Sequence, residues 1–322
     1  MRAIFLFISF LIIAIPVSQA QEVPSALENI DYLVTFSKGA NPTWGDDDHV
    51  QIYFFTIPTT IKAPFYIRVF DPEISGSNDM LNEAYNSSTR FSVYGGVGAY
   101  TNKEARGVNS TGNFKSGNQL ASKTFTQDDA KLDNTWYTFG PFNPQDGEFD
   151  KTMNAAVFKI VVEGLDGDDG NMYRFFLSSD KTTNKAIEGG NAFAYEISFR
   201  LKSQVGDVGH LFPRMENTTT SVKLNNFDFD KDGYIRITSI NKKCHDMKPS
   251  ADGNWEISKE EISKDERNTS LDIQFIKKLD ILNDMTFNIT DETNQALPMY
   301  SYPAGGIPKY KFKVDVVYET DK

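Results

Sequence analysis

The residues best suited to chemistry are eight consecutive ones, Asp228-Phe229-Asp230-Lys231-Asp232-Gly233-Tyr234-Ile235. Three carboxylates alternate with other side chains, so that they can converge on one cation. Gly233 permits a sharp turn, the main-chain carbonyl of Tyr234 offers another oxygen, and Ile235 anchors the loop in the core. This spacing predicts a Ca²⁺ site whose ligands are Asp228, Asp230, Asp232 and the carbonyl of Tyr234. The alternative is an exposed Asp/Gly turn without metal.

The same segment, Asp228–Ile235, resembles the calcium loops of EF-hand and dockerin-like proteins. It departs from them at the twelfth position, where Ser239 replaces the bidentate Glu. The flanking residues 224–229 and 234–240 have the composition of strands rather than helices. The resemblance implies calcium binding, and the flanks favour an Asp-rich turn that joins two strands.

A second acidic stretch runs from Ser250 to Ile257. With Ile257 at the anchor position of a calcium loop, Asp252 and Asn254 fall at ligand positions and Glu261 takes the twelfth. These residues are further candidate ligands, and the stretch could complete the site begun by Asp228. An ordinary Asp-Gly turn followed by a capped helix explains it equally well.

Two other acidic runs, 46–48 and 166–169, have the pattern of solvated loops between strands.

The N-terminus has the organisation of a secretory signal peptide. Arg2 precedes an apolar run that ends at Pro16, and Ser18-Gln19-Ala20 follows as a small-residue cleavage site. We therefore predict a signal peptide over residues 1–20 and a mature protein that is secreted or periplasmic. A transmembrane anchor is the alternative, but the apolar run is short for it. No membrane span is expected once the signal is removed.

The charge balance restricts the partners. The chain has 33 Lys and Arg residues against 44 Asp and Glu residues, a net charge of −11. This balance repels nucleic acid and favours cations, so no nucleic-acid partner is expected.

Cys244 is the only cysteine, so no internal disulfide can form. Stability must come from the core, or from the core and a metal.

Alternation of apolar and polar residues predicts strands, most clearly at Phe193–Leu201 and Tyr310–Tyr318. Less regular strands are predicted at Val50–Ile57, Phe65–Phe70, Arg90–Tyr94, Trp136–Phe139, Val157–Glu163, Tyr173–Leu177, Leu271–Ile276 and Thr286–Thr290. A capping-box pattern predicts one short helix over Ser258–Arg267.

These elements predict an all-β chain of two antiparallel, jelly-roll-like β-sandwich domains, with the short helix in the second. A polar stretch near residues 203–218 divides the chain into an N-terminal domain, 21–203, and a C-terminal domain, 204–322. One extended sandwich is the competing interpretation.

The N-terminal half is similar to the pre-peptidase C-terminal domains of bacterial exoproteins. The similarity covers the strand ending at Pro58, the strand and turn Pro64–Pro72, the acidic turn Ser75–Asp79 and the strand Arg90–Gly96. Asp79 stands near the place of that family's motif aspartate. The resemblance implies a non-catalytic accessory module, often associated with calcium.

Catalytic motifs are scarce. The sequence has three histidines and contains no nucleophile elbow, zinc-protease pair, phosphate loop or dinucleotide fingerprint. We therefore expect a binding or surface-interaction protein, whose partner is a glycan or a cell-envelope protein. Trp44, Trp136 and Trp255 are candidate glycan-stacking residues, although core packing accounts for any one of them. The alternatives are a carboxylate-dependent glycosidase or related hydrolase, and a structural component of an envelope assembly.

Overall fold

The structure, a computed structural model, describes residues 21–46 and 48–312. The predicted signal peptide, residues 1–20, lies outside the described residues. The strands are β1 (Glu22–Val23), β2 (Tyr32–Phe36), β3 (Val50–Pro58), β4 (Phe65–Phe70), β5 (Thr89–Gly95), β6 (Asn118–Phe125), β7 (Trp136–Phe142), β8 (Glu148–Asp150), β9 (Ala155–Gly164), β10 (Gly170–Ser178), β11 (Asn191–Ala194), β12 (Glu196–Leu201), β13 (Val208–Leu211), β14 (Ser221–Phe227), β15 (Gly233–Thr238), β16 (His245–Met247), β17 (Trp255–Glu261), β18 (Asp272–Lys277), β19 (Asn283–Asp291) and β20 (Met299–Tyr300). The 3-10 turns are η1 (Pro42–Trp44), η2 (Lys103–Arg106), η3 (Gln127–Leu132), η4 (Pro144–Asp146) and η5 (Lys264–Glu266).

The predicted all-β class is confirmed, because every sheet is built from antiparallel strands. Within the described ranges, no helical segment has the length and apolar character needed to cross a membrane.

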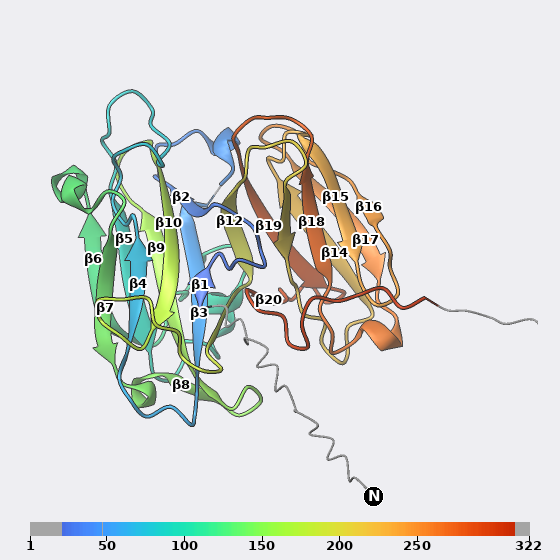
Figure 1. The fold of residues 1–322 in the computed structure, drawn as a ribbon, viewed down its shortest axis with the longest axis horizontal. Helices are drawn as coiled ribbons and strands as arrows, with labels where there is room; N and C mark the ends of the chain where they lie inside the picture. Colours follow the sequence, from blue (N-terminus) through green and yellow to red (C-terminus); the bar gives the residue numbers. More distant parts are fainter. Residues whose placement is uncertain (1–20, 47, 313–322) are drawn as a thin grey trace, which may run out of the picture.

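One long sheet runs through both halves of the chain. Its strands follow the order β17-β14-β19-β12-β2-β10-β4-β7, and β1 pairs beside β10. The central pairing joins β12 to β19, from Glu196 opposite Asn288 to Leu201 opposite Asn283. The sheet therefore continues across the domain boundary predicted after residue 203. Figure 1 shows two lobes side by side, with β12 and β19 where they meet.

Two smaller sheets cover this long sheet. One has the order β20-β11-β3-β9-β5-β6, with β8 beside β9, and the other has the order β13-β18-β15-β16. The ring of Tyr53 on β3 lies 5.3 Å from Phe175 on β10. In the second lobe, Phe275 on β18 lies 5.4 Å from Phe199 on β12. The molecule is thus a pair of sandwiches that share one sheet.

A single apolar core joins the two sandwiches. Buried residues from all three sheets belong to one cluster, including Phe91, Phe175, Phe199 and Phe275. The sheet that contains β3 also buries its outer face, where Phe54 and Phe193 stack with ring centroids 5.1 Å apart. Tyr100, which precedes η2, packs against the same two rings. Burial on both faces explains why β3 is apolar along nearly its whole length.

The alternation of Phe193–Leu201 forms two strands rather than the one predicted. The chain bends at Tyr195, so that β11 pairs with β3 in the smaller sheet and β12 pairs with β2 and β19 in the long sheet. Both strands are buried at every position after the first, and the alternation of residue types continues unbroken through the bend. The periodicity of a sequence indicates which side chains are buried, but it does not indicate which sheet a strand joins.

The short helix predicted over Ser258–Arg267 is wrong for its first half. Residues up to Glu261 belong to β17, which pairs with β14 along its whole length. A capping box does occur, but at Ser263 and Glu266, where it closes the 3-10 turn η5. The alternating exposure of β17 fits an edge strand with one face in solvent.

The other predicted strands are confirmed. Seven of them lie within β3, β4, β5, β7, β9, β10 and β19, and Leu271–Ile276 overlaps β18. The strand predicted at Tyr310–Tyr318 differs: residues 310–312 belong to no strand, and residues 313–318 lie outside the described residues.

Candidate metal centre

The loop between β14 and β15 holds the first two candidate ligands, Asp228 and Asp230. Both residues have positive φ angles, 60° and 56°, as does Lys231 at 53°. Asp tolerates this left-handed region better than most residues do, because its short side chain can bond to nearby backbone groups. The turn is closed by the Asp232 N–H, which donates to the Phe229 carbonyl at 3.0 Å.

A second loop, between β16 and β17, brings Asp252 to the same place. The Gly253 N–H donates to the Asp228 carboxylate at 2.6 Å, and the Lys231 N–H donates to the Ser250 carbonyl at 3.0 Å. Asp228, Asp230 and Asp252 each offer one carboxylate oxygen, and these oxygens lie within 4.8 Å of one another. The three side chains form a cluster able to hold a metal ion, which we call the Asp228 cluster.

Asp232 does not join the Asp228 cluster. Its buried carboxylate forms an ion pair with Lys277, and it accepts a hydrogen bond from the Leu279 N–H at 3.0 Å. The sequence predicted that Asp228, Asp230 and Asp232 converge on one cation. In the structure the third carboxylate of the cluster comes from Asp252 instead. The physical reason is the buried Lys277 ammonium, which needs a carboxylate partner.

The remaining predicted ligands lie in different places. Tyr234 is in β15, opposite Ile276, with an exposed side chain. Asn254 adjoins the cluster, where its carbonyl accepts from the Asp228 N–H at 3.3 Å, but its side-chain amide donates to the Asp252 carbonyl. Glu261 lies at the opposite end of β17 from the cluster, paired with Ser221.

The electrostatics of the Asp228 cluster favour a cation. Burial raises the pKa of Asp228 to about 7; the Gly253 N–H lowers it, and the carboxylates of Asp230 and Asp252 raise it further. Burial also raises the pKa of Asp230, with Asp252 and Asp232 adding to the effect. Neighbouring negative charges that raise one another's pKa are stabilised when a positive charge lies between them.

A cavity of about 310 Å³ lies beside Asp228 and Asp230, lined also by Trp44, Asn283 and Asp284. The Asn283 side chain is 2% exposed, and its amide nitrogen donates to the Phe229 carbonyl at 3.2 Å. Its side-chain oxygen Oδ1 is buried and has no hydrogen-bond partner among the described residues. The Asn283 side-chain oxygen is therefore a further candidate ligand for a hard cation.

A second acidic cluster is formed by Asp71, Glu73 and Asp133, whose carboxylates also offer oxygens within 4.8 Å of one another. Burial raises the pKa of Glu73 to about 7, although its hydrogen bond with Ser75 lowers it. Sequence reasoning missed this group, since Asp133 is far from the other two in the chain. The Asp71-Pro72 turn was its only local sign.

The acidic run 166–169 is used to hold loops together. The buried carboxylate of Asp169 accepts hydrogen bonds from the N–H groups of Asn82 and Asn86, and from the Ser87 hydroxyl at 2.9 Å. A carboxylate saturated by such donors contributes to the local fold.

The three tryptophans do not form one platform. Trp136 is on β7 and Trp255 is on β17, which are opposite ends of the long sheet. Trp44, in η1, is half-buried, with its ring 6.3 Å from Phe36, yet it lines the cavity beside the Asp228 cluster. Of the three, Trp44 is therefore the one placed next to the candidate metal centre.

A much larger cleft, of about 800 Å³, opens between the lobes, and sequence reasoning missed it. The first lobe contributes Tyr100, Arg106 and Tyr195, the second contributes Arg214, and Tyr300 lies on β20, which pairs with β11 of the first lobe. Tyr100 and Arg106 come from one segment and the other three residues from separate ones, so no local motif marks the whole set.

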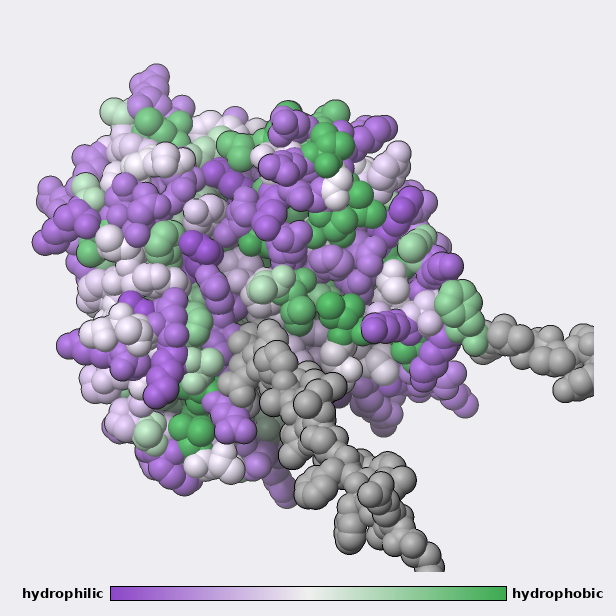
Figure 2. Space-filling view, viewed as in Figure 1, coloured by the Kyte–Doolittle hydropathy of each residue, from purple (hydrophilic) through white to green (hydrophobic). Residues whose placement is uncertain are grey.

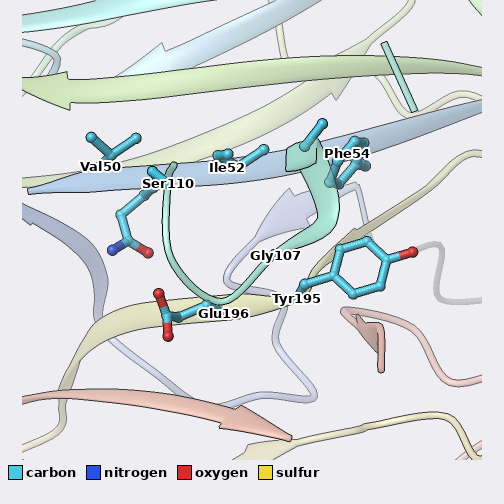
Figure 3. A pocket seen from close by; sticks show the side chains of 9 residues that line it. Val50, Ile52, Phe54, Gly107, Ser110, Tyr195 and Glu196 are labelled. Atoms are coloured by element: carbon cyan, nitrogen blue, oxygen red, sulfur yellow. The ribbon is translucent and has the colours of Figure 1, made fainter. Parts of the chain in front are cut away.

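Figure 3 shows a small neighbouring cavity of about 10 Å³, lined by Ile52, Ser110, Tyr195 and others. Tyr195 and Glu196, where β12 begins, point in opposite directions, and both line the small cavity. Tyr195 also lines the large cleft. The volume of the small cavity suits at most one water molecule. The large cleft is therefore the space available to a ligand on this side.

No family model matches the chain, and no curated protein matches its sequence.

Proposed function

We propose that this chain is an exported, non-catalytic binding protein, secreted or periplasmic, in which Ca²⁺ joins two loops at the Asp228 cluster. The observation that carries the proposal is the convergence of Asp228, Asp230 and Asp252. Asn283 lines the adjoining cavity, and its buried side-chain oxygen has no partner in the part of the chain that the structure describes. The fold supplies a rigid base for these loops, because β14, β15 and β17 are anchored in sheets on either side.

The donor set favours Ca²⁺ over other common metals. All the donors are oxygens, and neither histidine nor cysteine belongs to the cluster. Ca²⁺ accepts six to eight oxygen ligands in flexible geometry, and so the three carboxylates of the two loops can be supplemented by an amide and by water. Mg²⁺ demands a more regular octahedron. Calcium would also offset the repulsion that three converging carboxylates impose on the loops.

The proposed partner is a glycan or a cell-envelope protein. Trp44 supports the glycan, since a half-buried indole beside a metal-holding cluster offers a flat apolar face next to charged oxygens. Figure 2 shows a mostly hydrophilic face with separate hydrophobic areas. That face therefore favours a polar partner over burial against another apolar surface.

One observation favours the glycosidase alternative. Two carboxylates, those of Asp150 and Glu216, line the large cleft together with tyrosines, and glycosidases act through such a pair. Asp150 also stabilises the local fold, because its carboxylate accepts a hydrogen bond from the Met153 N–H at 2.8 Å.

Chromatography of oligosaccharides after long incubation with the protein distinguishes a binding protein from a glycosidase. The proposal predicts unchanged chain lengths, and products abolished in both D150N and E216Q would establish the enzyme.

The metal is tested by calorimetric titration of the metal-free protein with Ca²⁺ and, separately, with Mg²⁺. We expect one tight Ca²⁺ site that is lost in D252N, since Asp252 is exposed and its removal leaves the core intact. The matched control is D246N, which removes an exposed carboxylate paired with Arg236. Calcium affinity that is equal in D252N and the parent protein would refute the proposed site.

A further inference from the structure

The large cleft contains two arginines without acidic partners. Arg106 and Arg214 both line it, and neither forms an ion pair within residues 21–46 and 48–312. In a chain of net charge −11, basic side chains have many carboxylates to pair with. Arg106 and Arg214 are half-buried and form no ion pair with Asp150 or Glu216, although these carboxylates line the same cleft, so both guanidinium groups remain available to an anionic ligand.

The Arg106 side chain is held in position by aromatic groups. Its guanidinium carbon lies 5.2 Å from the centre of the Tyr100 ring. Burial lowers the pKa of Arg106, but the hydroxyl groups of Tyr195 and Tyr100 more than offset this, and the group stays charged. Its Nε is buried and has no hydrogen-bond partner in the described part of the chain. A charged guanidinium that packs on an aromatic ring and lines a cleft can bind a carboxylate.

The rest of the lining suits a sugar. Tyr100, Tyr195 and Tyr300, whose side chains combine an aromatic ring with a hydroxyl group, all line the cleft. The rim carries the amides of Asn217 and Asn268, which lie 3.2 Å apart in a hydrogen bond. Rings combined with hydroxyls and amides match a saccharide, which has apolar faces and polar edges. The volume of about 800 Å³ is within the range of small-ligand sites.

We propose that this cleft binds an acidic oligosaccharide, one whose sugars carry carboxylates, with Arg106 and Arg214 as the anion-binding residues. Binding here goes beyond the calcium site, because the cleft shares no lining residue with the cavity beside the Asp228 cluster. Arg214 faces Tyr300 from the second lobe, and its charge lowers the otherwise raised pKa of that tyrosine. A ligand held between Arg106 and Arg214 would bridge the two lobes.

The test is calorimetric titration with trigalacturonate, with the neutral galactose trimer of the same linkage and with triglutamate. We expect trigalacturonate to bind at least about tenfold more tightly than either of the others, with an affinity that falls as salt is added. R106Q and R214Q should each weaken trigalacturonate binding by about tenfold or more, as loss of a charge-assisted hydrogen bond does. R106K should lie between R106Q and the parent protein.

The matched control is R236Q, which removes a partly exposed arginine on β15, outside the cleft, and should leave the affinity unchanged. Since Arg106 packs on Tyr100, the thermal unfolding of R106Q is measured alongside, and R214Q gives an independent result if R106Q fails to fold. Chelation of calcium should leave trigalacturonate binding intact, so failure of the metal site and failure of this proposal are distinguishable.

Three results would overturn the proposal. These are no binding of trigalacturonate up to about 10 mM, equal affinity for the neutral trimer, and full affinity in a folded R214Q variant. Tighter binding of triglutamate would replace the saccharide with an acidic peptide.

Discussion

The Asp228 carboxylate accepts a hydrogen bond from the Gly253 N–H at 2.6 Å, and this contact joins two loops that are 25 residues apart in the chain. It places Asp252 beside Asp228, so that the third carboxylate of the cluster comes from another loop. A β-carbon on Gly253 would lie 2.6 Å from the Thr43 side chain, which shows that η1 closes over the same contact. The candidate metal centre is therefore assembled from three segments.

The first prediction concerns pH. Asp228 has a raised pKa of about 7 in the folded chain, so between its ordinary value of 3.8 and about 7 the folded state holds a proton that the unfolded state has lost. The stability of the metal-free protein should therefore fall as pH rises from 5 to about 7. Glu28 and Glu73 act in the same direction, since burial raises the pKa of each to about 7.

Thermal unfolding between pH 5 and 8, after removal of metal, checks this expectation. D228N should flatten part of the profile, and Ca²⁺ should do the same above pH 7 in the parent protein. A metal-free Tm that rises steadily across this range would contradict the assignment.

The second prediction separates Asp232 from the Asp228 cluster. Removing the negative charge in D232N leaves the buried Lys277 ammonium without its carboxylate, which costs about 3–5 kcal/mol. D232N should lower Tm equally with and without Ca²⁺, whereas D252N should lower Tm only when Ca²⁺ is present. Differential scanning calorimetry of both variants, with and without chelator, measures the contrast. A calcium-dependent loss in D232N would return Asp232 to the ligand set.

The third prediction concerns the junction between the lobes. Arg200 on β12 forms two hydrogen bonds of 2.7 Å with Asp284 on β19, and both side chains are less than a tenth exposed. R200M leaves the buried carboxylate of Asp284 without its ion-pair partner, and it should lower the free energy of unfolding by about 3–5 kcal/mol. The double variant R200M/D284L removes both charges, and should recover much of that loss. Urea unfolding gives the energies, and an additive double variant would show that the pair is not coupled.

The fourth prediction concerns cooperativity. Phe275 is fully buried and contacts Phe199 and Phe287 on the shared sheet. F275A should cost about 3–5 kcal/mol, and both lobes should still unfold in one transition because they share a core. Coincident melting by circular dichroism and tryptophan fluorescence checks this. F149A, at a residue 59% exposed, is the control. Two separate transitions in F275A would show lobes that fold independently.

Much of the fold was predictable from local pattern. Strands such as Phe65–Phe70 were located correctly because burial of one or both faces leaves a periodic record in the residue types. The strand ending at Leu201 was placed correctly, but its bend at Tyr195 was not, since a change of sheet leaves alternation intact. The helix over Ser258–Arg267 failed because pairing with β14 overrode local propensity.

The sequence alone determined an acidic, all-β chain with an aspartate-rich turn at Asp228, because composition, alternation and turn chemistry are local properties. Only the tertiary structure decided which carboxylates meet. It paired Asp232 with Lys277 and brought Asp252 to Asp228, and it assembled Asp71, Glu73 and Asp133 from distant segments. The reason is that a site is set by distances in space, and strand pairing fixes those distances through contacts between residues far apart in the chain.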